Sequence, residues 1–189
     1  MDPSSARSEG VTEMLTAPPS SHEGTSWERF EALYRSSRDD VYAYVCTLLR
    51  DPAAAEDVTA LAFERAYRRR RTFDRRRGEE RAWLFGIARN AALDELRRRR
   101  RVAALVTEPA EESVSAEDED GVEVALRRTA LQAALAKLPA REREIVALKF
   151  HAGLSNTELA GVLGVSESNA GTLLYRTMEK LRKACNATA

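Results

Sequence analysis

One stretch, residues 79–101 (EERAWLFGIARNAALDELRRRRR), limits the possible folds more than any other part of the chain. Its apolar residues Leu84, Ile87, Ala88 and Ala91 recur at spacings of three and four. Because an α-helix turns once every 3.6 residues, these side chains share one face and can pack on a core. The stretch therefore predicts a long helix from Glu79 to Arg101 within an all-α protein.

A second stripe of the same helix carries polar groups beside the apolar face. It consists of Trp83, Asn90, Asp94, Arg97 and Arg101. An aromatic ring can stack on an unpaired base, and guanidinium groups can bind phosphate. The stripe therefore suggests contact with nucleic acid. The alternative is a surface helix with a half-buried tryptophan and a solvated charged end.

Charge is strongly segregated along the chain, although the 189 residues have a formal net charge of zero. Residues 68–101 contain fourteen arginines against five acids, whereas residues 108–123 contain eight acids and no base. A basic block followed by an acidic block indicates two separate electrostatic tasks. The length and the 43% of hydrophobic residues fit one or two small domains.

The sequence lacks the patterns of several other protein classes. Cys46 and Cys185 lie far apart in helical patterns, so we expect neither a disulfide nor a zinc site. No apolar run approaches ~18 residues and no apolar signal core follows Met1, so we expect a cytoplasmic protein without membrane insertion. No Gly-rich phosphate loop, His-x-x-x-His pair or nucleophile elbow occurs. We therefore expect no enzymatic activity, no catalytic residue, no metal and no cofactor.

Two further helices are predicted before residue 79. After a disordered leader over residues 1–26, Ser26 is expected to cap a helix that ends near Arg50, before the Asp51-Pro52 pair. Periodicity predicts the next helix over residues 53–71. With the arginine-rich helix they form a first domain, residues 27–101, of about the right size for one small core.

An acidic stretch, residues 102–123, follows this domain. It contains Pro109 and many acids and has no long hydrophobic period, so we expect a flexible, extended linker. It is either a spacer only or an acidic strand that occupies a channel built for nucleic acid.

The second domain, residues 124–184, is expected to contain several helices and to end in a short tail over residues 185–189. Helices are predicted over residues 122–138 and 141–151. The apolar residues of the second of these are Ile145, Val146, Leu148 and Phe150.

The end of this domain has the pattern of a helix-turn-helix. Ser155 and Glu158 stand at the two positions of a capping box, and Gly164-Val165-Ser166 is expected to form a turn before a last helix. Such a motif places its last helix in the major groove, where Asn169 could read adenine and Arg176 could contact phosphate. An unrelated helical hairpin is the alternative.

These motifs together resemble a known family. FEALY, AEDVTALAFERAY (55–67) and WLFGIARNAALDELRR (83–98) resemble sigma region 2. ALAKLPAREREIVAL (134–148) and LSNTELAGVLGVSESNAGTLLYRTMEKLR (154–182) resemble sigma region 4. The chain is therefore similar to the extracytoplasmic-function (ECF, group 4) sigma factors of the sigma-70 family. The resemblance covers nearly all of the chain outside its tails and implies a function in promoter-specific transcription initiation.

The resemblance also implies partners and sites. The partners are core RNA polymerase, promoter DNA and an anti-sigma factor; on the polymerase, region 2 docks on the β′ clamp helices and region 4 on the β flap. Residues that match the core-binding motif are Glu56, Asp57, Val58, Phe63 and Arg65. Residues implied in melting and holding the −10 element are Trp83, Arg89, Asn90, Asp94 and Arg97. Residues implied in reading the −35 element are Ser166, Ser168, Asn169, Thr172, Tyr175 and Arg176.

The chain departs from the family pattern at a few positions. Ala60 replaces a frequent glutamine, Asn156 a frequent aromatic residue, and Gly171 and Leu173 replace frequent basic residues of the recognition helix. A different class, an ordinary helix-turn-helix repressor or activator, would explain only residues 134–183 and would leave the first domain without a role.

Overall fold

The computed structural model describes residues 21–74, 76, 78–104 and 122–186. In these residues the chain forms seven α-helices, a short 3-10 helix and no strand, which confirms the predicted all-α fold. The helices are α1 (Ser21–Leu49), α2 (Pro52–Arg69), η1 (Arg70–Thr72), α3 (Glu80–Ala103), α4 (Val122–Ala136), α5 (Ala140–Phe150), α6 (Asn156–Leu163) and α7 (Glu167–Asn186). None of the described helices is long and apolar enough to cross a membrane.

The first helix begins earlier than the sequence predicts. Helix α1 starts at Ser21, so Ser26 lies inside the helix, and its predicted role as the cap is wrong. Of the expected leader, residues 1–20 lie outside the described part of the chain, and residues 21–26 are helical. The boundary between α1 and α2 agrees with the prediction, because Asp51 accepts a hydrogen bond from the backbone N–H of Ala54 at 3.1 Å and Pro52 occupies the first turn.

Helices α1, α2 and α3 pack pairwise around one apolar core. The predicted packing face of α3 is confirmed, since Leu84, Ile87, Ala88 and Ala91 are all buried. Phe85 is also fully buried, and its ring meets the ring of Tyr44 from α1 edge to face, with centroids 5.5 Å apart. Such aromatic pairs add stability beyond the area that they bury.

The predicted helix-turn-helix is present in α6 and α7. The side chain of Ser155 accepts from the backbone N–H of Glu158, and the Glu158 carboxylate accepts from the backbone N–H of Ser155. Gly164 ends α6 in the left-handed conformation, with φ of 68°, which a glycine adopts at little cost. Ser166 then caps α7 by accepting from the backbone N–H of Asn169 at 3.2 Å.

Helix α5 differs from the prediction at its end. Ile145, Val146 and Leu148 are buried as expected, but Phe150 is 64% exposed and contributes little to the core. It is the last residue of α5, where the chain turns toward α6, so its side chain lies beyond the packed face.

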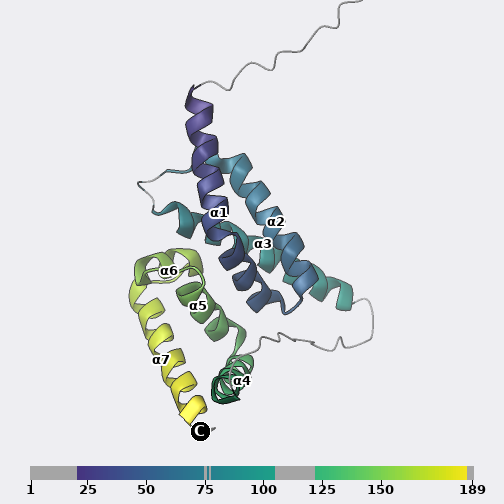
Figure 1. Ribbon diagram of the computed structural model, residues 1–189, viewed down its shortest axis with the longest axis vertical. Helices are drawn as coiled ribbons and strands as arrows, with labels where there is room; N and C mark the ends of the chain where they lie inside the picture. The colour runs from purple at the N-terminus through teal and green to yellow at the C-terminus, as the bar shows by residue number, and fades with distance from the viewer. Residues whose placement is uncertain (1–20, 75, 77, 105–121, 187–189) are drawn as a thin grey trace, which may run out of the picture.

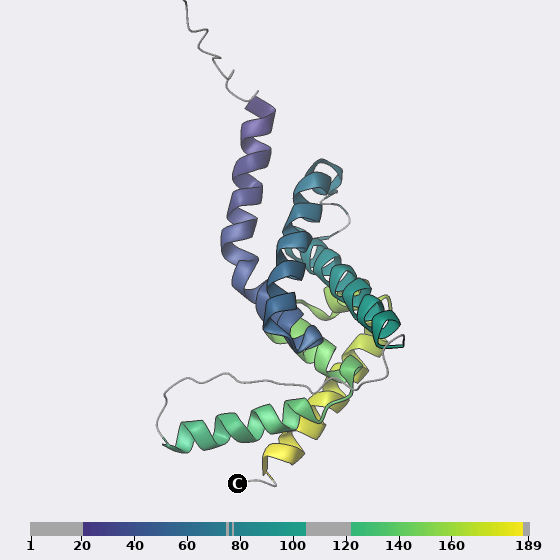
Figure 2. The same ribbon diagram turned by 90° about the vertical axis from the view of Figure 1, so that its right-hand side faces the viewer.

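The two halves of the chain pack directly against each other. Helix α5 lies against α1, and α6 lies against α3 (Figures 1 and 2). Buried residues of both halves, from Leu33 to Ala170, belong to one continuous apolar cluster. The acidic linker expected at 102–123 falls mostly on residues 105–121, which the structure does not describe, whereas Val102 and Ala103 extend α3. The sequence predicted two joined modules but not this shared core.

Candidate nucleic-acid interface

The polar stripe of α3 lies on the surface along most of its length. Asn90, Asp94 and Arg97 are exposed, and Trp83 is half-buried. The ring of Trp83 packs against the ring of Phe73, with centroids 5.2 Å apart and planes inclined by 44°. One side of the indole is therefore held by the protein, which fixes its orientation at the surface.

Asp94 joins this stripe to helix α2. Its carboxylate lies 3.1 Å from Arg97 and 3.6 Å from Arg65. The structure thus brings together residues that the sequence assigned to two tasks, Arg65 to the polymerase and Asp94 and Arg97 to DNA. All three side chains are at least 36% exposed, so these ion pairs contribute little to stability and can exchange with a ligand.

Arg89 lies apart from the rest of the predicted −10 set. Its Nε donates to Oε1 of Glu144 from α5 at 2.6 Å, and only 21% of its side chain is exposed. In this arrangement Arg89 belongs to the contact between the two halves of the chain, and not to the exposed stripe.

Acidic residues of the same domain partly neutralise the basic end of α3. Glu95 accepts hydrogen bonds from Arg98 and Arg99, which lower the pKa of its carboxyl to about 2. Arg99 also contacts Asp51 at 2.9 Å. The carboxyl of Asp51 has a lowered pKa, first because it accepts from the backbone N–H of Ala54 and second because of Arg99. Several of the arginines that the sequence assigned to phosphate binding therefore have acidic partners in the fold.

The outer face of α7 presents polar and aromatic side chains to solvent. The predicted −35 residues are all exposed, and they are Ser166, Ser168, Asn169, Thr172, Tyr175 and Arg176. Tyr175 is 69% exposed, which is the largest exposed fraction among the large hydrophobic side chains of the described residues.

Two departures from the family pattern face the body of the domain. A Cβ on Gly171 would lie 3.7 Å from Nδ2 of Asn156 on α6, at van der Waals distance, so this side of α7 faces α6. Leu173 is partly buried and packs against the main core. Gly171 and Leu173 therefore lie on the side of α7 that faces the rest of the protein.

The predicted polymerase-binding set is divided between surface and core. Glu56 and Asp57 are exposed on α2, but Val58 and Phe63 are each 95% buried. Val58 and Phe63 therefore belong to the core beneath this surface, and a partner cannot contact them directly. Phe63 packs its ring against Tyr34 of α1, with centroids 4.8 Å apart.

A groove between α1 and α2 runs beside these residues. It has a volume of about 550 Å³, and Tyr34, Tyr42, Glu56 and Ala60 are among its lining residues. Thr59 also lines it, and its buried hydroxyl has no hydrogen-bond partner among the described residues. The sequence did not indicate Tyr34 and Tyr42 as residues of a binding site. They come close to the groove-lining residues of α2 only because α1 and α2 pack against each other.

Both halves of the chain match known protein families. The family model for Sigma-70 region 2 matches residues 33–102, and the model for Sigma-70, region 4 matches residues 128–181. The ECF RNA polymerase sigma factor BldN of Streptomyces coelicolor is 35% identical over 158 residues, which cover 82% of this chain and 60% of that protein. The ECF RNA polymerase sigma factor SigL of Mycobacterium tuberculosis is 32% identical over 153 residues, which cover 80% of this chain and 85% of that protein.

A solved structure has the same fold. The sigma factor RpoE in complex with the anti-sigma factor NepR, from Bartonella quintana, superposes with a TM-score of 0.73 at 21% identity, covering 84% of this chain and 98% of that one. Both sigma regions thus occur in one chain, in the same order, with all-α domains and an exposed recognition helix. The chain belongs to the sigma-70 family and is an ECF RNA polymerase sigma factor.

Proposed function

We propose that this protein binds core RNA polymerase in the cytoplasm and directs it to promoters by recognising a −35 element with α7 and melting a −10 element with α3. The observation that carries the proposal is that one chain contains both sigma regions, each with its predicted DNA-binding face at the surface. A repressor needs only the second region and gives the first no role.

Helix α7 has the geometry of a reading helix. Its capped N-terminal half carries Asn169 and Thr172, whose polar side chains can hydrogen-bond base edges in a major groove. Farther along, Tyr175 and Arg176 extend from the same exposed side. Arg176 suits a phosphate contact, and the aromatic ring of Tyr175 suits apolar contact with a thymine methyl group.

Helix α3 supplies the groups that promoter opening requires. Extruding a base costs about a few kcal/mol, and stacking an unpaired base on an aromatic ring returns roughly 1–3 kcal/mol. Trp83, held in place by Phe73, offers such a ring beside the exposed amide of Asn90. The free energy gained by stacking a base on Trp83 is therefore comparable to the free energy that extruding the base costs.

The α1–α2 surface is the proposed docking site for the β′ clamp helices. Glu56 and Asp57 offer charges there, and the adjacent groove offers the rings of Tyr34 and Tyr42. The unpartnered hydroxyl of Thr59 can hydrogen-bond a group that enters the groove. Region 4 is proposed to bind the β flap, and an anti-sigma factor is proposed to regulate the protein. RpoE of Bartonella quintana was solved with such a partner.

The test is transcription in vitro from genomic fragments, with purified core polymerase and the full chain. We expect initiation at discrete start sites that core polymerase alone does not use. The variant Asp57→Arg should reduce co-elution with polymerase, whereas the control Glu31→Gln, on the exposed α1 surface, should not. A chain that binds DNA fragments but never co-elutes with core polymerase would instead support the repressor alternative.

A further inference from the structure

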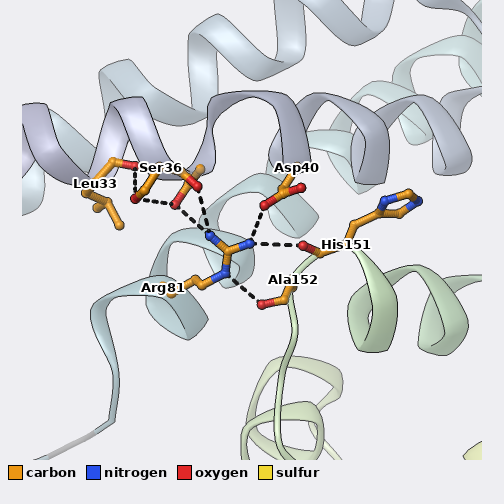
Figure 3. Close-up of polar contacts among 7 residues, drawn as sticks. Leu33, Ser36, Asp40, Arg81, His151 and Ala152 are labelled. Carbon is orange, nitrogen blue, oxygen red and sulfur yellow. Dashed lines mark hydrogen bonds and ion pairs between the residues drawn. The ribbon is translucent and has the colours of Figure 1, made fainter.

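The arginines of the basic block, residues 68–101, are not equally available to a ligand. Arg89 pairs with Glu144, and Arg81 donates five hydrogen bonds within the fold (Figure 3). The residues that accept from Arg81 are Ser36, Ser37, Asp40, His151 and Ala152. By contrast, Arg69 at the end of α2 is exposed, and its side chain has no hydrogen bond or ion pair among the described residues. The end of α2 therefore offers positive charge that the fold does not use.

Aromatic rings lie beside this charge. Tyr67 is in the last turn of α2, and its ring meets the ring of Trp27 from α1 edge to face, with centroids 5.8 Å apart. The guanidinium of Arg70 covers the Tyr67 ring at 3.8 Å, and its Nη1 donates to the backbone oxygen of Tyr67 at 2.8 Å. Such a cation over an aromatic face is held by the ring's electrostatic field. We call Trp27, Tyr67, Arg69 and Arg70 the Trp27 surface.

Trp27 is held by the fold and yet 51% exposed. Packing of α1 on α2 does not account for this exposed ring, because Phe30, one turn farther along α1, already packs on both Tyr67 and Phe63. Trp27 also lies six residues before Leu33, where the match to the Sigma-70 region 2 model begins. An oriented, half-exposed ring beside positive charge is the arrangement that binds single-stranded nucleic acid, since bases stack on the ring and cations attract the phosphates.

The Trp27 surface is close to the proposed −10 surface of α3. Phe73, which packs on Trp83, is separated from α2 only by the three residues of η1. The helical rise from Tyr67 to Phe73, together with the two ring contacts, places Trp27 and Trp83 at most roughly 30 Å apart. About nine stacked nucleotides span this distance at 3.4 Å each, and the start site lies about ten nucleotides beyond the centre of the −10 element.

The charges of α3 indicate the direction of the bound strand. The basic end of α3, from Arg97 to Arg101, suits the phosphates of DNA that is still double-stranded, and Trp83 near the start of α3 suits an unpaired base. A strand that runs from this basic end to Trp83 continues past Phe73 toward the end of α2. The template strand must enter the polymerase to direct RNA synthesis, so the strand that stays on the sigma factor is the non-template strand.

We propose that the Trp27 surface binds the unpaired non-template strand between the −10 element and the start site. Trp27 stacks on one base, Arg69 holds a neighbouring phosphate, and Arg70 adds positive charge. The proposal rests on the proposed function, in which α3 captures the opened −10 element. Because every base has a face that can stack, this contact does not read sequence. It stabilises the opened promoter on the start-site side of the −10 element.

The experiment uses the full chain bound to core polymerase and two forked promoter fragments, both double-stranded on the −35 side. In the short fork the non-template strand ends directly after the −10 element, and in the long fork it continues unpaired to the start site. We expect Trp27→Ala to bind the long fork about tenfold more weakly than wild type does and the short fork equally well. Trp27→Phe keeps a ring for stacking and should fall between the two.

The charge of the surface is tested separately with Arg69→Ala. Removing one contact to a single-stranded phosphate should lower the logarithmic salt slope on the long fork by about 0.7 and leave the slope on the short fork unchanged. The matched control is Arg35→Ala, because Arg35 pairs with Glu31 one turn away on α1. Should Trp27→Ala lose helix content, Arg69→Ala decides the question, since this exposed side chain has no partner in the described fold.

An abasic site placed at each unpaired position in turn locates the stacked base. At one position the loss of the base should weaken binding of wild type and leave binding of Trp27→Ala unchanged. An equal loss on both forks, or no loss on either, would overturn the proposal. Weaker association of Trp27→Ala with core polymerase in the absence of DNA would also overturn it, and would assign the surface to a protein partner. A wild-type complex that does not bind even the short fork would refute the proposed function itself.

Discussion

Nε of Arg89 lies 2.6 Å from Oε1 of Glu144, and this pair joins α3 to α5 across the contact between the two domains. Tyr44, itself fully buried, donates its hydroxyl to the same oxygen. Burial, and then the nearby Glu144 charge, raise the pKa of Tyr44 well above its usual value, so the phenol remains a donor. The contribution of this pair to stability can be measured directly.

The first prediction concerns this pair. Glu144→Ala leaves Arg89 partly buried without its partner and should lower the free energy of unfolding by about 2 kcal/mol, less than for a fully buried pair because 21% of Arg89 remains exposed. In thermal unfolding this corresponds to a Tm lower by about 5 °C. The double variant Arg89→Met with Glu144→Leu removes both charges and should return to within about 1 kcal/mol of wild type. A double variant as unstable as the single one would contradict a role for the unpaired charge.

A second prediction concerns pH. Burial, chiefly, lowers the pKa of His151 below its ordinary value of 6.5, although the nearby Asp40 opposes the shift. At His151 the unfolded chain therefore binds a proton more readily than the folded chain. The free energy of unfolding is not reduced by this residue above pH 6.5, and it falls as the pH drops below 6.5. Urea unfolding at pH 7.5 and 5.5 should show a larger loss for wild type than for His151→Gln. Equal losses would mean that His151 does not titrate differently in the two states.

Glu95 gives a prediction about salt. Its carboxyl, with a pKa of about 2, stays ionised at any physiological pH and occupies Arg98 and Arg99. Glu95→Gln should release Arg98 to phosphate, whereas Arg99 keeps its ion pair with Asp51, so binding of the polymerase-bound protein to promoter DNA should depend more steeply on salt, by about 1 in the logarithmic slope. Glu31→Gln, which frees an arginine on α1 instead, is the control. An unchanged slope would show that Arg98 does not face DNA.

The exposed amide of Asn90 tests promoter opening more cleanly than Trp83 does. Trp83 packs on Phe73, so its removal also disturbs the fold, whereas Asn90 is exposed and can be truncated without a cavity. Asn90→Ala should leave polymerase binding intact and reduce permanganate reactivity of the −10 region. Unchanged reactivity would count against the assignment of the stripe.

The last prediction distinguishes residues of α7 that contact bases from residues that contact phosphate. Asn169→Ala should cost about 1–3 kcal/mol on preferred −35 sequences and little on others. Arg176→Ala should weaken all sequences alike and reduce the salt slope by about 1. Binding to a panel of −35 variants distinguishes the two; a uniform loss for Asn169→Ala would mean that it contacts only the DNA backbone.

Local features of the fold could be predicted because their signals lie within a few residues of one another. The capping box of Ser155 and Glu158, the left-handed Gly164 and the buried face of α3 each follow from local spacing and backbone sterics. The early start of α1 at Ser21 could not, because helix ends depend on packing as well as on caps.

The sequence alone therefore determined the helical elements, the segregation of charge and the two sigma regions. Only the tertiary structure decided which charged residues stay exposed and which join the two domains. Arg81 and Ala152 are separated by 71 positions and Arg89 and Glu144 by 55, and no periodicity relates residues at such distances. The arginines of α3 look equivalent in the sequence, but Arg81 and Arg89 are partly buried in contacts with the second domain, whereas Arg97 stays exposed.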